Sequence, residues 1–404
     1  MTAFDNELES VRIIDPHSPV SDRDDEEFHT TEIITVGLAH GTNDLFFSFI
    51  PPLQPLLMEK LSLSNAQAGL FTVFLQGPSL LQPFIGHYAD RHNLRTLFIV
   101  GPTISAIMLT MVGLAPSYGI LALLMLIAGF STAGFHSIAP VITASKAGKK
   151  IGRGMAFFML FGEFGYGMGP LLLIGVVGLL TVNELPWLIS LGALCSIILC
   201  FNFKNFDTSR QTREKGLVIS QETRKEMVKI MLPIIIYAFI TSFIYANIIN
   251  FLPTYLKNEG ASFNYYSSAF SIIEVSATIG IFFSGWVSDR IGQRVIVFIS
   301  TITTVIFSLM LLFTNGWWQI PVLVALGLLA FSPNPALSAI VQTHFPENRS
   351  LANGLYMSVN FVIRSLGVFL VGLLADHFGL RNVFFYSCLT ALFGLPVILM
   401  LPKK

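Results

Sequence analysis

The sequence predicts an all-α polytopic membrane protein of about 12 transmembrane helices, arranged as two pseudo-symmetric six-helix halves. Three observations lead to this fold class. The 404 residues are 53% apolar and only 12% charged, whereas soluble domains carry about 25% charged residues. Apolar runs of about 20 residues, enough to cross the hydrocarbon core as a helix, recur along the chain. A short polar loop also recurs at corresponding places in the two halves.

The first segment, 1–31, is acidic and carries nine acids against two arginines, without an apolar core. It is therefore predicted to be a disordered cytosolic tail rather than a signal peptide. A regulatory role for this tail stays open.

The apolar runs are predicted to cross the bilayer as helices, because a helix satisfies its backbone hydrogen bonds internally. Six runs precede a polar, charged segment at 204–227, and six follow it. This segment is the predicted cytoplasmic linker between an N-terminal half, 32–203, and a C-terminal half, 228–404. The expected spans are 33–57, 65–88, 96–114, 118–142, 153–178, 186–203, 228–255, 265–287, 295–313, 317–341, 351–374 and 382–401.

Lysine and arginine set the predicted orientation of these spans. With the N-terminus inside, the outer loops hold only Lys60, Lys257 and Arg381, and the inner segments hold most other basic residues. Because basic loops are retained in the cytoplasm, both termini are predicted to be cytoplasmic.

The three cysteines, Cys195, Cys200 and Cys388, lie in apolar runs and lack the spacing of metal ligands. They are expected to pack as small buried hydrophobic side chains. The sequence therefore predicts neither a metal site nor a cofactor.

The recurring loop reads GHYADRHNLR at 86–95 and GWVSDRIGQR at 285–294. Gly292, or Asn93 in its place, permits a left-handed turn, and Gly86 and Gly285 are expected to allow neighbouring helices to approach closely. A third copy, GLLADHFGLR at 372–381, falls on the opposite side of the membrane. Parallel halves built from inverted three-helix units are a known transporter architecture.

With its spans, central loop and paired G-x-x-x-D-R loops, the chain resembles the major facilitator superfamily over roughly residues 32–402. Within span 5, GYGMGP at 165–170 is similar to a glycine motif of antiporters in that superfamily. The HGTND at 40–44 and the pair Phe135–His136 resemble the fosmidomycin-resistance branch, a group of drug exporters. In that branch the pair continues with proline and glutamate, whereas here Ser137 and Ile138 follow.

The resemblance implies a cytoplasmic latch that holds one conformation and breaks in the other. The alternative is that these loops only anchor the topology through positive charge. The predicted latch residues are Gly86, Asp90, Arg91, Arg95, Gly285, Asp289, Arg290 and Arg294. The predicted antiporter-like motif is Gly165, Gly169 and Pro170.

Ionisable residues at mid-membrane depth are costly and usually functional. His40 and Asp44 stand one helical turn apart and so share a face. Such a carboxylate can take up and release a proton, and the histidine can tune it, shuttle the proton or contact the substrate. The alternative is a structural Asp–His hydrogen bond. The predicted proton-coupling residues are Asp44, His40, Glu163 and Glu274.

The resemblance implies that spans 1, 4, 7 and 10 line a central cavity. Tyr237, Thr241 and Tyr245 share a face of span 7, with ordinary helix–helix hydrogen bonding as the alternative. Glu163 and Arg364 occupy equivalent positions in the two halves. Either they form an ion pair across the halves, or each finds its polar partners within its own half. The predicted cavity residues are Asn43, His136, Arg364, Tyr237, Thr241, Tyr245 and Asn247.

The sequence thus predicts a secondary active transporter that works by alternating access, through proton-coupled efflux of a small amphipathic drug or metabolite. Proton-coupled uptake, facilitated diffusion and a membrane sensor without transport are the alternatives. No nucleotide loop, metalloprotease motif or nucleophile elbow is present, so the chain is not expected to be an enzyme. The expected partners are a small substrate, protons and the lipid bilayer, with no nucleic acid, for a monomer in a bacterial inner membrane.

Overall fold

The structure, a computed structural model, describes residues 27–89, 92–204, 206, 221–345 and 349–402. Most of the predicted acidic tail, Asp90, Arg91 and most of the predicted linker lie outside the described residues. The described part is helical, contains no strand, and holds 12 helices long and apolar enough to cross a membrane. The predicted fold class is therefore confirmed.

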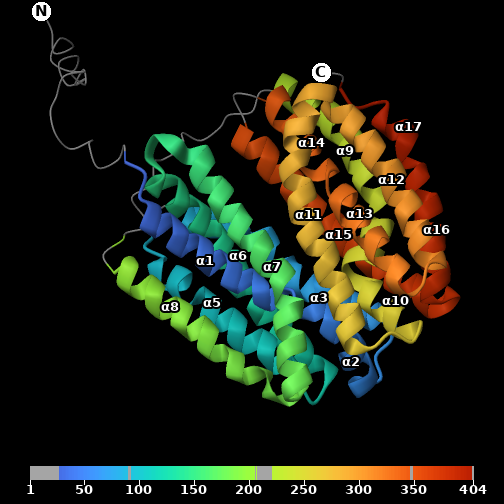
Figure 1. Cartoon of the computed structure of the whole chain (residues 1–404). Helices are drawn as coiled ribbons and strands as arrows, with labels where there is room; N and C mark the ends of the chain where they lie inside the picture. The colour runs from blue at the N-terminus through green and yellow to red at the C-terminus, as the bar shows by residue number, and fades with distance from the viewer. Residues whose placement is uncertain (1–26, 90–91, 205, 207–220, 346–348, 403–404) are drawn as a thin grey trace, which may run out of the picture.

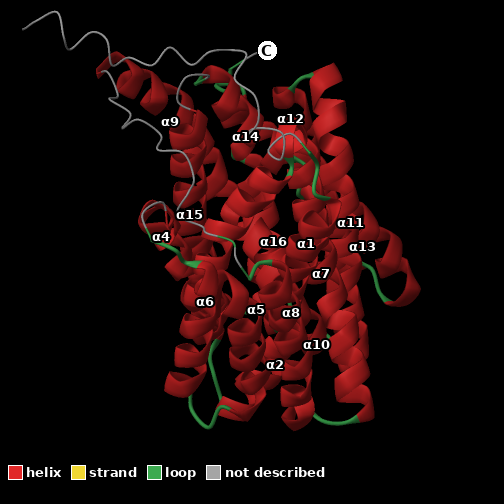
Figure 2. Ribbon diagram, turned by 90° about the vertical axis from the view of Figure 1, so that its left-hand side faces the viewer, coloured by secondary structure: helices red, strands yellow, loops and turns green. Residues whose placement is uncertain are grey.

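Several spans consist of two helices in line (Figures 1 and 2). The N-terminal helices are α1 (Thr30–Phe47), α2 (Ile50–Leu61), α3 (Asn65–Gln76), α4 (Gln82–Ala89), α5 (Arg95–Thr110), α6 (Tyr118–Lys146), α7 (Ile151–Leu179) and α8 (Ile189–Asn202). The C-terminal helices are α9 (Gln221–Ala246), α10 (Leu252–Asn258), α11 (Phe263–Ile291), α12 (Gln293–Phe313), α13 (Gln319–Ala330), α14 (Pro333–His344), α15 (Arg349–Phe378), α16 (Leu380–Leu392) and α17 (Gly394–Ile398).

Prolines explain where some of these spans are interrupted. Span 1 breaks between α1 and α2, where Pro51 and Pro52 begin the second helix. Span 10 breaks between α13 and α14, and Pro333 opens α14. Proline has no backbone N–H to donate and clashes with the preceding turn. The break in span 10 falls in the SPNP segment, 332–335, as its two prolines predict.

The two halves meet most closely at the end that carries α2, α3 and α10, and their ribbons diverge toward the end that carries the C-terminus (Figure 1). Gln54 donates to Thr254 Oγ1 across the halves at 3.0 Å, and Thr72 donates to Asn250 Oδ1 at 2.6 Å. Gly69 packs so tightly on α15 that a Cβ there would lie 2.8 Å from Val368 O. These contacts join the halves near one end of the bundle.

Large apolar side chains cover much of the outside of the molecule. Phe84, Phe282 and Trp317 are each more than 70% exposed, as suits a surface that faces lipid. Cys388 is buried and Cys195 half-buried, but Cys200 is exposed on α8, so the expectation that all three cysteines are buried is wrong. In a bilayer an exposed apolar side chain carries no cost, because lipid is as apolar as the core.

Candidate functional site

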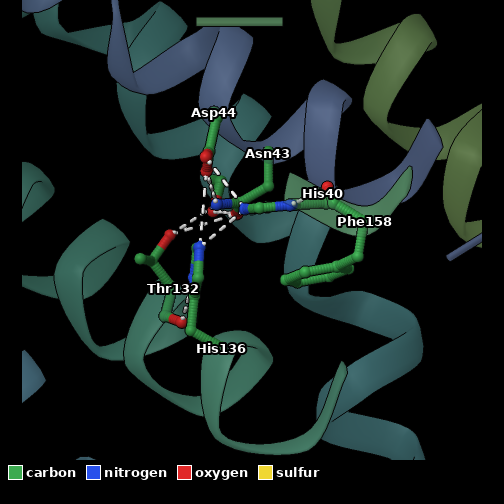
Figure 3. A network of polar contacts seen from close by, with 7 residues as sticks. His40, Asn43, Asp44, Thr132, His136 and Phe158 are labelled. Atoms are coloured by element: carbon green, nitrogen blue, oxygen red, sulfur yellow. Dashed lines mark hydrogen bonds and ion pairs between the residues drawn. The ribbon is translucent and has the colours of Figure 1, made fainter. Parts of the chain in front are cut away.

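Helices α1 and α6 bring two histidines and one aspartate together (Figure 3). His40 and Asp44 lie one turn apart on α1, and His40 Nε2 is 3.0 Å from Asp44 Oδ2. His136 of α6 places its Nε2 3.0 Å from His40 Nε2 and 3.7 Å from Asp44 Oδ1. Helical periodicity predicted the first pair, but only the packing of α6 against α1 adds His136.

The opposite nitrogens of both rings are held by backbone carbonyls. His40 donates from Nδ1 to Phe158 O at 2.8 Å, and His136 donates from Nδ1 to Thr132 O at 3.0 Å. Because a carbonyl oxygen can only accept, each Nδ1 must carry its proton. In the neutral rings both Nε2 atoms are then acceptors. Two acceptor nitrogens and a carboxylate therefore converge, an arrangement that positive charge between them would stabilise.

Asn43 positions Asp44 through hydrogen bonds to neighbouring helices. It donates to Asp44 Oδ1 at 3.0 Å and to Thr132 Oγ1 at 2.9 Å, and accepts from Ser105 at 2.7 Å. Its side chain is fully buried. The prediction that Asn43 lines the substrate cavity is therefore wrong for this conformation, since its amide ties α1 to α5 and α6 and positions the aspartate.

Helix α7 covers the His40 ring. The ring of Phe158 stacks on it, with centroids 3.9 Å apart and planes 11° apart. A Cβ on Gly162 would lie 2.2 Å from His40 Cε1, so only glycine leaves room for the ring. His40 is 3% exposed as a result, whereas the side chains of His136 and Asp44 keep 25% and 21% of their surface. The cluster is thus closed on one side and open on the other.

The antiporter-like motif lies in the contact between α7 and α1. A Cβ on Gly165 would lie 2.1 Å from Gly41 O, and one on Gly169 would lie 1.9 Å from Ser48 Oγ. Pro170 is buried in the same helix. These residues therefore let two backbones approach directly, and their predicted link to antiport stays a prediction.

Two carboxyl groups lie on the helices that cross between the halves. Glu163 of α7 is half-buried, and Glu274 of α11 is buried, with no hydrogen-bond partner for its Oε1 atom among the described residues. Near them Ser271 donates to Gly167 O, and a Cβ on Gly167 would lie 2.8 Å from Val275. The two acids thus belong to the tight crossing of α7 and α11.

The predicted pair of Glu163 and Arg364 is not formed in this conformation. Arg364 donates instead to Asn334 Oδ1 at 3.1 Å, within its own half. Pseudo-symmetry relates the two positions, but equivalent positions need not lie close enough to the symmetry axis to touch.

The prediction that span 7 lines the cavity with polar side chains is wrong for most of its residues. Tyr237 hydrogen-bonds Thr301 at 2.9 Å, Asn247 donates to Ser387 at 2.8 Å, and Thr241 donates to the backbone of its own helix. All three are at most 2% exposed. They hold neighbouring helices together, the alternative interpretation of this face. Tyr245, half-buried, donates to Ala330 O at the end of α13.

The predicted latch is described only in part, because Asp90 and Arg91 lie outside the described residues. Gly292 has φ 95° and makes the expected turn. Asn93 does not take a left-handed conformation, and its side chain accepts from the Arg95 N–H instead. A Cβ at Gly86 or Gly285 would meet no atom within 4 Å in the part of the chain that the structure describes, so the close helix approach expected at these glycines is not seen there.

The basic residues of the second loop contact their own half. The Arg290 guanidinium lies 3.6 Å from the centroid of the Trp286 ring, and Arg294 donates to Leu399 O. Asp289 precedes them at the end of α11. Whether these residues latch the protein stays a prediction.

A contact that sequence reasoning missed lies in the third copy of the loop. Asp376 accepts from the backbone N–H of Asn65 at 2.7 Å and of Ala66 at 2.9 Å, at the start of α3. The copy at 372–381 was visible as a repeat, but which helix its aspartate meets depends on the packing of the halves.

Fold and sequence together define a membrane transporter. The family model of the Major Facilitator Superfamily matches residues 36–260 and 234–404, so the chain belongs to that superfamily. It is 24% identical over 371 residues to the Fosmidomycin resistance protein of Escherichia coli (strain K12), covering 89% of this chain and 90% of that protein. The predicted resemblance is confirmed, and the family consists of transporters rather than enzymes.

Further similarities extend this relationship. The uncharacterized MFS-type transporter YfnC of Bacillus subtilis (strain 168) is 23% identical over 86% of this chain and 87% of its own. Multidrug resistance protein MdtG of Salmonella arizonae is 34% identical over 37% of this chain and 38% of its own. The structure of the nucleoside transporter NupG superposes with a TM-score of 0.74 at 17% identity, covering 91% of this chain and 98% of NupG. At that identity the likeness to NupG shows the fold alone.

Proposed function

We propose that this transporter is a proton-coupled exporter that exchanges protons for a small amphipathic drug or metabolite by alternating access. The names of two relatives, a fosmidomycin resistance protein and a multidrug resistance protein, support efflux. The glycine motif at 165–170 supports antiport. The proposal places the chain as a monomer in a bacterial inner membrane, with both termini in the cytoplasm.

Glu274 is the residue on which the proposed proton coupling rests. It is 7% exposed, and its Oε1 atom has no hydrogen-bond partner in the described part of the chain. A carboxylate buried without a partner costs free energy that binding a proton removes. Asp44, in contrast, accepts a hydrogen bond from the Asn43 amide. We therefore place the coupling proton on Glu274, with Glu163 as the neighbouring acid.

The position of Glu274 explains how a proton could drive the exchange. It lies on α11, which packs on α7 of the other half through Gly167 and Val275. Gain or loss of charge at this crossing changes the relative free energies of arrangements that bury or expose the carboxyl group. A difference of about 1.4 kcal/mol shifts their ratio tenfold, and alternating access needs only such shifts.

The arrangement described here corresponds to the inward-facing state under this proposal. With the termini in the cytoplasm, the end that carries α2, α3 and α10 is the outer end. Asp376 at the start of α3 and the pair Lys257–Glu59 then close the outer side. Negative charge is favourable at a helix N-terminus, so the Asp376 contact stabilises this state.

The test is flux in everted membrane vesicles with and without an imposed proton gradient. The probe is fosmidomycin, taken from the name of the relative, followed by a panel of amphipathic dyes. Glu274→Gln should reduce gradient-driven flux at least tenfold while exchange of substrate for substrate persists. Glu226→Gln, the same change at an exposed position of α9, should behave as the parent. Flux that ignores the gradient in the parent would indicate facilitated diffusion, and absence of flux for every probe would favour a sensor.

A further inference from the structure

The cluster of His40, His136 and Asp44 presents more acceptors than donors. The Nδ1–H groups of His40 and His136 donate hydrogen bonds to the backbone carbonyls of Phe158 and Thr132. The two ring nitrogens, both acceptors when the rings are neutral, lie 3.0 Å apart, and each faces a different oxygen of the Asp44 carboxylate: His40 Nε2 is 3.0 Å from Oδ2 and His136 Nε2 is 3.7 Å from Oδ1. While both rings are neutral and no cation lies among them, these atoms repel each other.

The spacing of the two ring nitrogens and the carboxylate suits a transition-metal ion. Bonds of 2.0–2.1 Å around a tetrahedral Zn²⁺ place neighbouring ligand atoms about 3.3–3.4 Å apart. The observed separations bracket that value, so small shifts of the side chains would complete the geometry. Imidazole nitrogens with a carboxylate oxygen are also a ligand set found in zinc sites.

The surroundings match those of a metal site. A ligating histidine almost always donates its other ring N–H to a carbonyl or carboxylate, which fixes the ring and its tautomer. Both histidines here make that bond, and Asn43 holds the carboxylate in the same way. Phe158 and Gly162 close the site on the α7 side. The partly exposed side chains of His136 and Asp44 leave the other side open to an ion and to a fourth ligand.

We propose that His40 Nε2, His136 Nε2 and the Asp44 carboxylate bind a divalent first-row transition-metal ion of the Zn²⁺ type. The site would carry a net charge of about +1, from one dication and one carboxylate. The half-buried Glu163 follows Gly162, which packs against the His40 ring, so its carboxyl group adds negative charge near the site and favours a cation there. A fourth coordination position on the open side takes water or an anionic group of a substrate. Binding is independent of the direction and coupling of transport.

The test is calorimetric titration of the purified full-length protein with Zn²⁺, paired with the visible absorption of Co²⁺, which is intense in four-coordinate sites. One ion per chain should bind in the parent. His136→Gln and Asp44→Asn should each weaken that binding at least tenfold and reduce the Co²⁺ bands. His344→Gln is the matched control, because His344 makes the same Nδ1 bond to the carbonyl four residues earlier, in the other half.

Size-exclusion profiles and thermal melts identify variants that fail to fold. If one of the two ligand variants, His136→Gln or Asp44→Asn, does not fold, the Zn²⁺ affinity of the other one tests the proposal. The proposal is overturned if the parent binds no Zn²⁺, or if folded His136→Gln and Asp44→Asn proteins bind it like the parent, as ions held by surface histidines would. Zn²⁺ binding is measured without transport. A protein that binds Zn²⁺ but whose flux does not depend on the proton gradient would therefore support the metal site and contradict only the proposed proton coupling.

Discussion

Asp376 accepts hydrogen bonds from the backbone N–H and the side-chain amide of Asn65, the first residue of α3, and so joins helices of the two halves at one end of the bundle. The aspartate faces the positive end of the α3 dipole, where a carboxylate is favoured. Under the proposed alternating access, this contact exists only while that end of the bundle is closed.

Asp376→Asn should therefore destabilise the state described here by about 1 kcal/mol, which shifts the ratio of the two conformations about fivefold. Spin labels at Thr181, which follows α7, and at Asn315, which follows α12 in the other half, should report a larger population of long distances. Glu259→Gln breaks an ion pair with Arg381 inside one half and should leave the distances unchanged. Identical distributions for parent and Asp376→Asn would show that the contact does not govern the state.

A methyl group at Gly165 should destabilise the fold, because its Cβ would lie 2.1 Å from Gly41 O. Gly165→Ala is expected to cost about 1–3 kcal/mol through overpacking and to lower the thermal midpoint in detergent. Gly175→Ala, on the same helix with nothing within 4 Å of its Cβ, should be neutral or slightly stabilising, because alanine favours helix. Equal melting of the two variants would contradict the close contact of α1 and α7.

Asn43→Ala should act through stability rather than through the substrate. The change leaves Ser105 and Thr132 without their buried partner, at a cost of about 1–3 kcal/mol. Substrate affinity of the folded fraction should stay close to that of the parent, because the Asn43 side chain is fully buried. A strong loss of substrate affinity without a fall in the thermal midpoint would instead indicate that Asn43 contacts the substrate in the cavity.

The double-mutant cycle of Glu163→Gln and Arg364→Gln should give a coupling energy within about 0.5 kcal/mol of zero for stability in this conformation. Arg364 and Asn334, which are hydrogen-bonded, should show measurable coupling in the parallel cycle with Asn334→Ala. Strong coupling between Glu163 and Arg364 would mean that the two groups meet in the opposite state, and that this state dominates in the sample.

The sequence was informative wherever a local rule decides the outcome. Apolar run length located the spans, and helical periodicity placed His40 beside Asp44. It was uninformative wherever the outcome depends on which helix packs against which. Periodicity put Tyr237 and Thr241 on one face, but it could not say that this face meets α12 and α17 rather than a cavity. Similarly, no local pattern shows that His136 joins the cluster, or that Asn43 points away from the open side.

The glycine contacts between α1 and α7 limit how this protein can move. Where a carbonyl of one helix touches the Cα of another, as at Gly41 and Gly165, a sliding step would drive neighbouring side chains into backbone. Helices α1 and α7 must therefore travel together, and His40 and Asp44, both on α1, travel with them. Helices of the opposite half then determine from which side of the membrane the His–Asp cluster is accessible. Substitutions on α11 and α15 should therefore alter access to this cluster without contacting it.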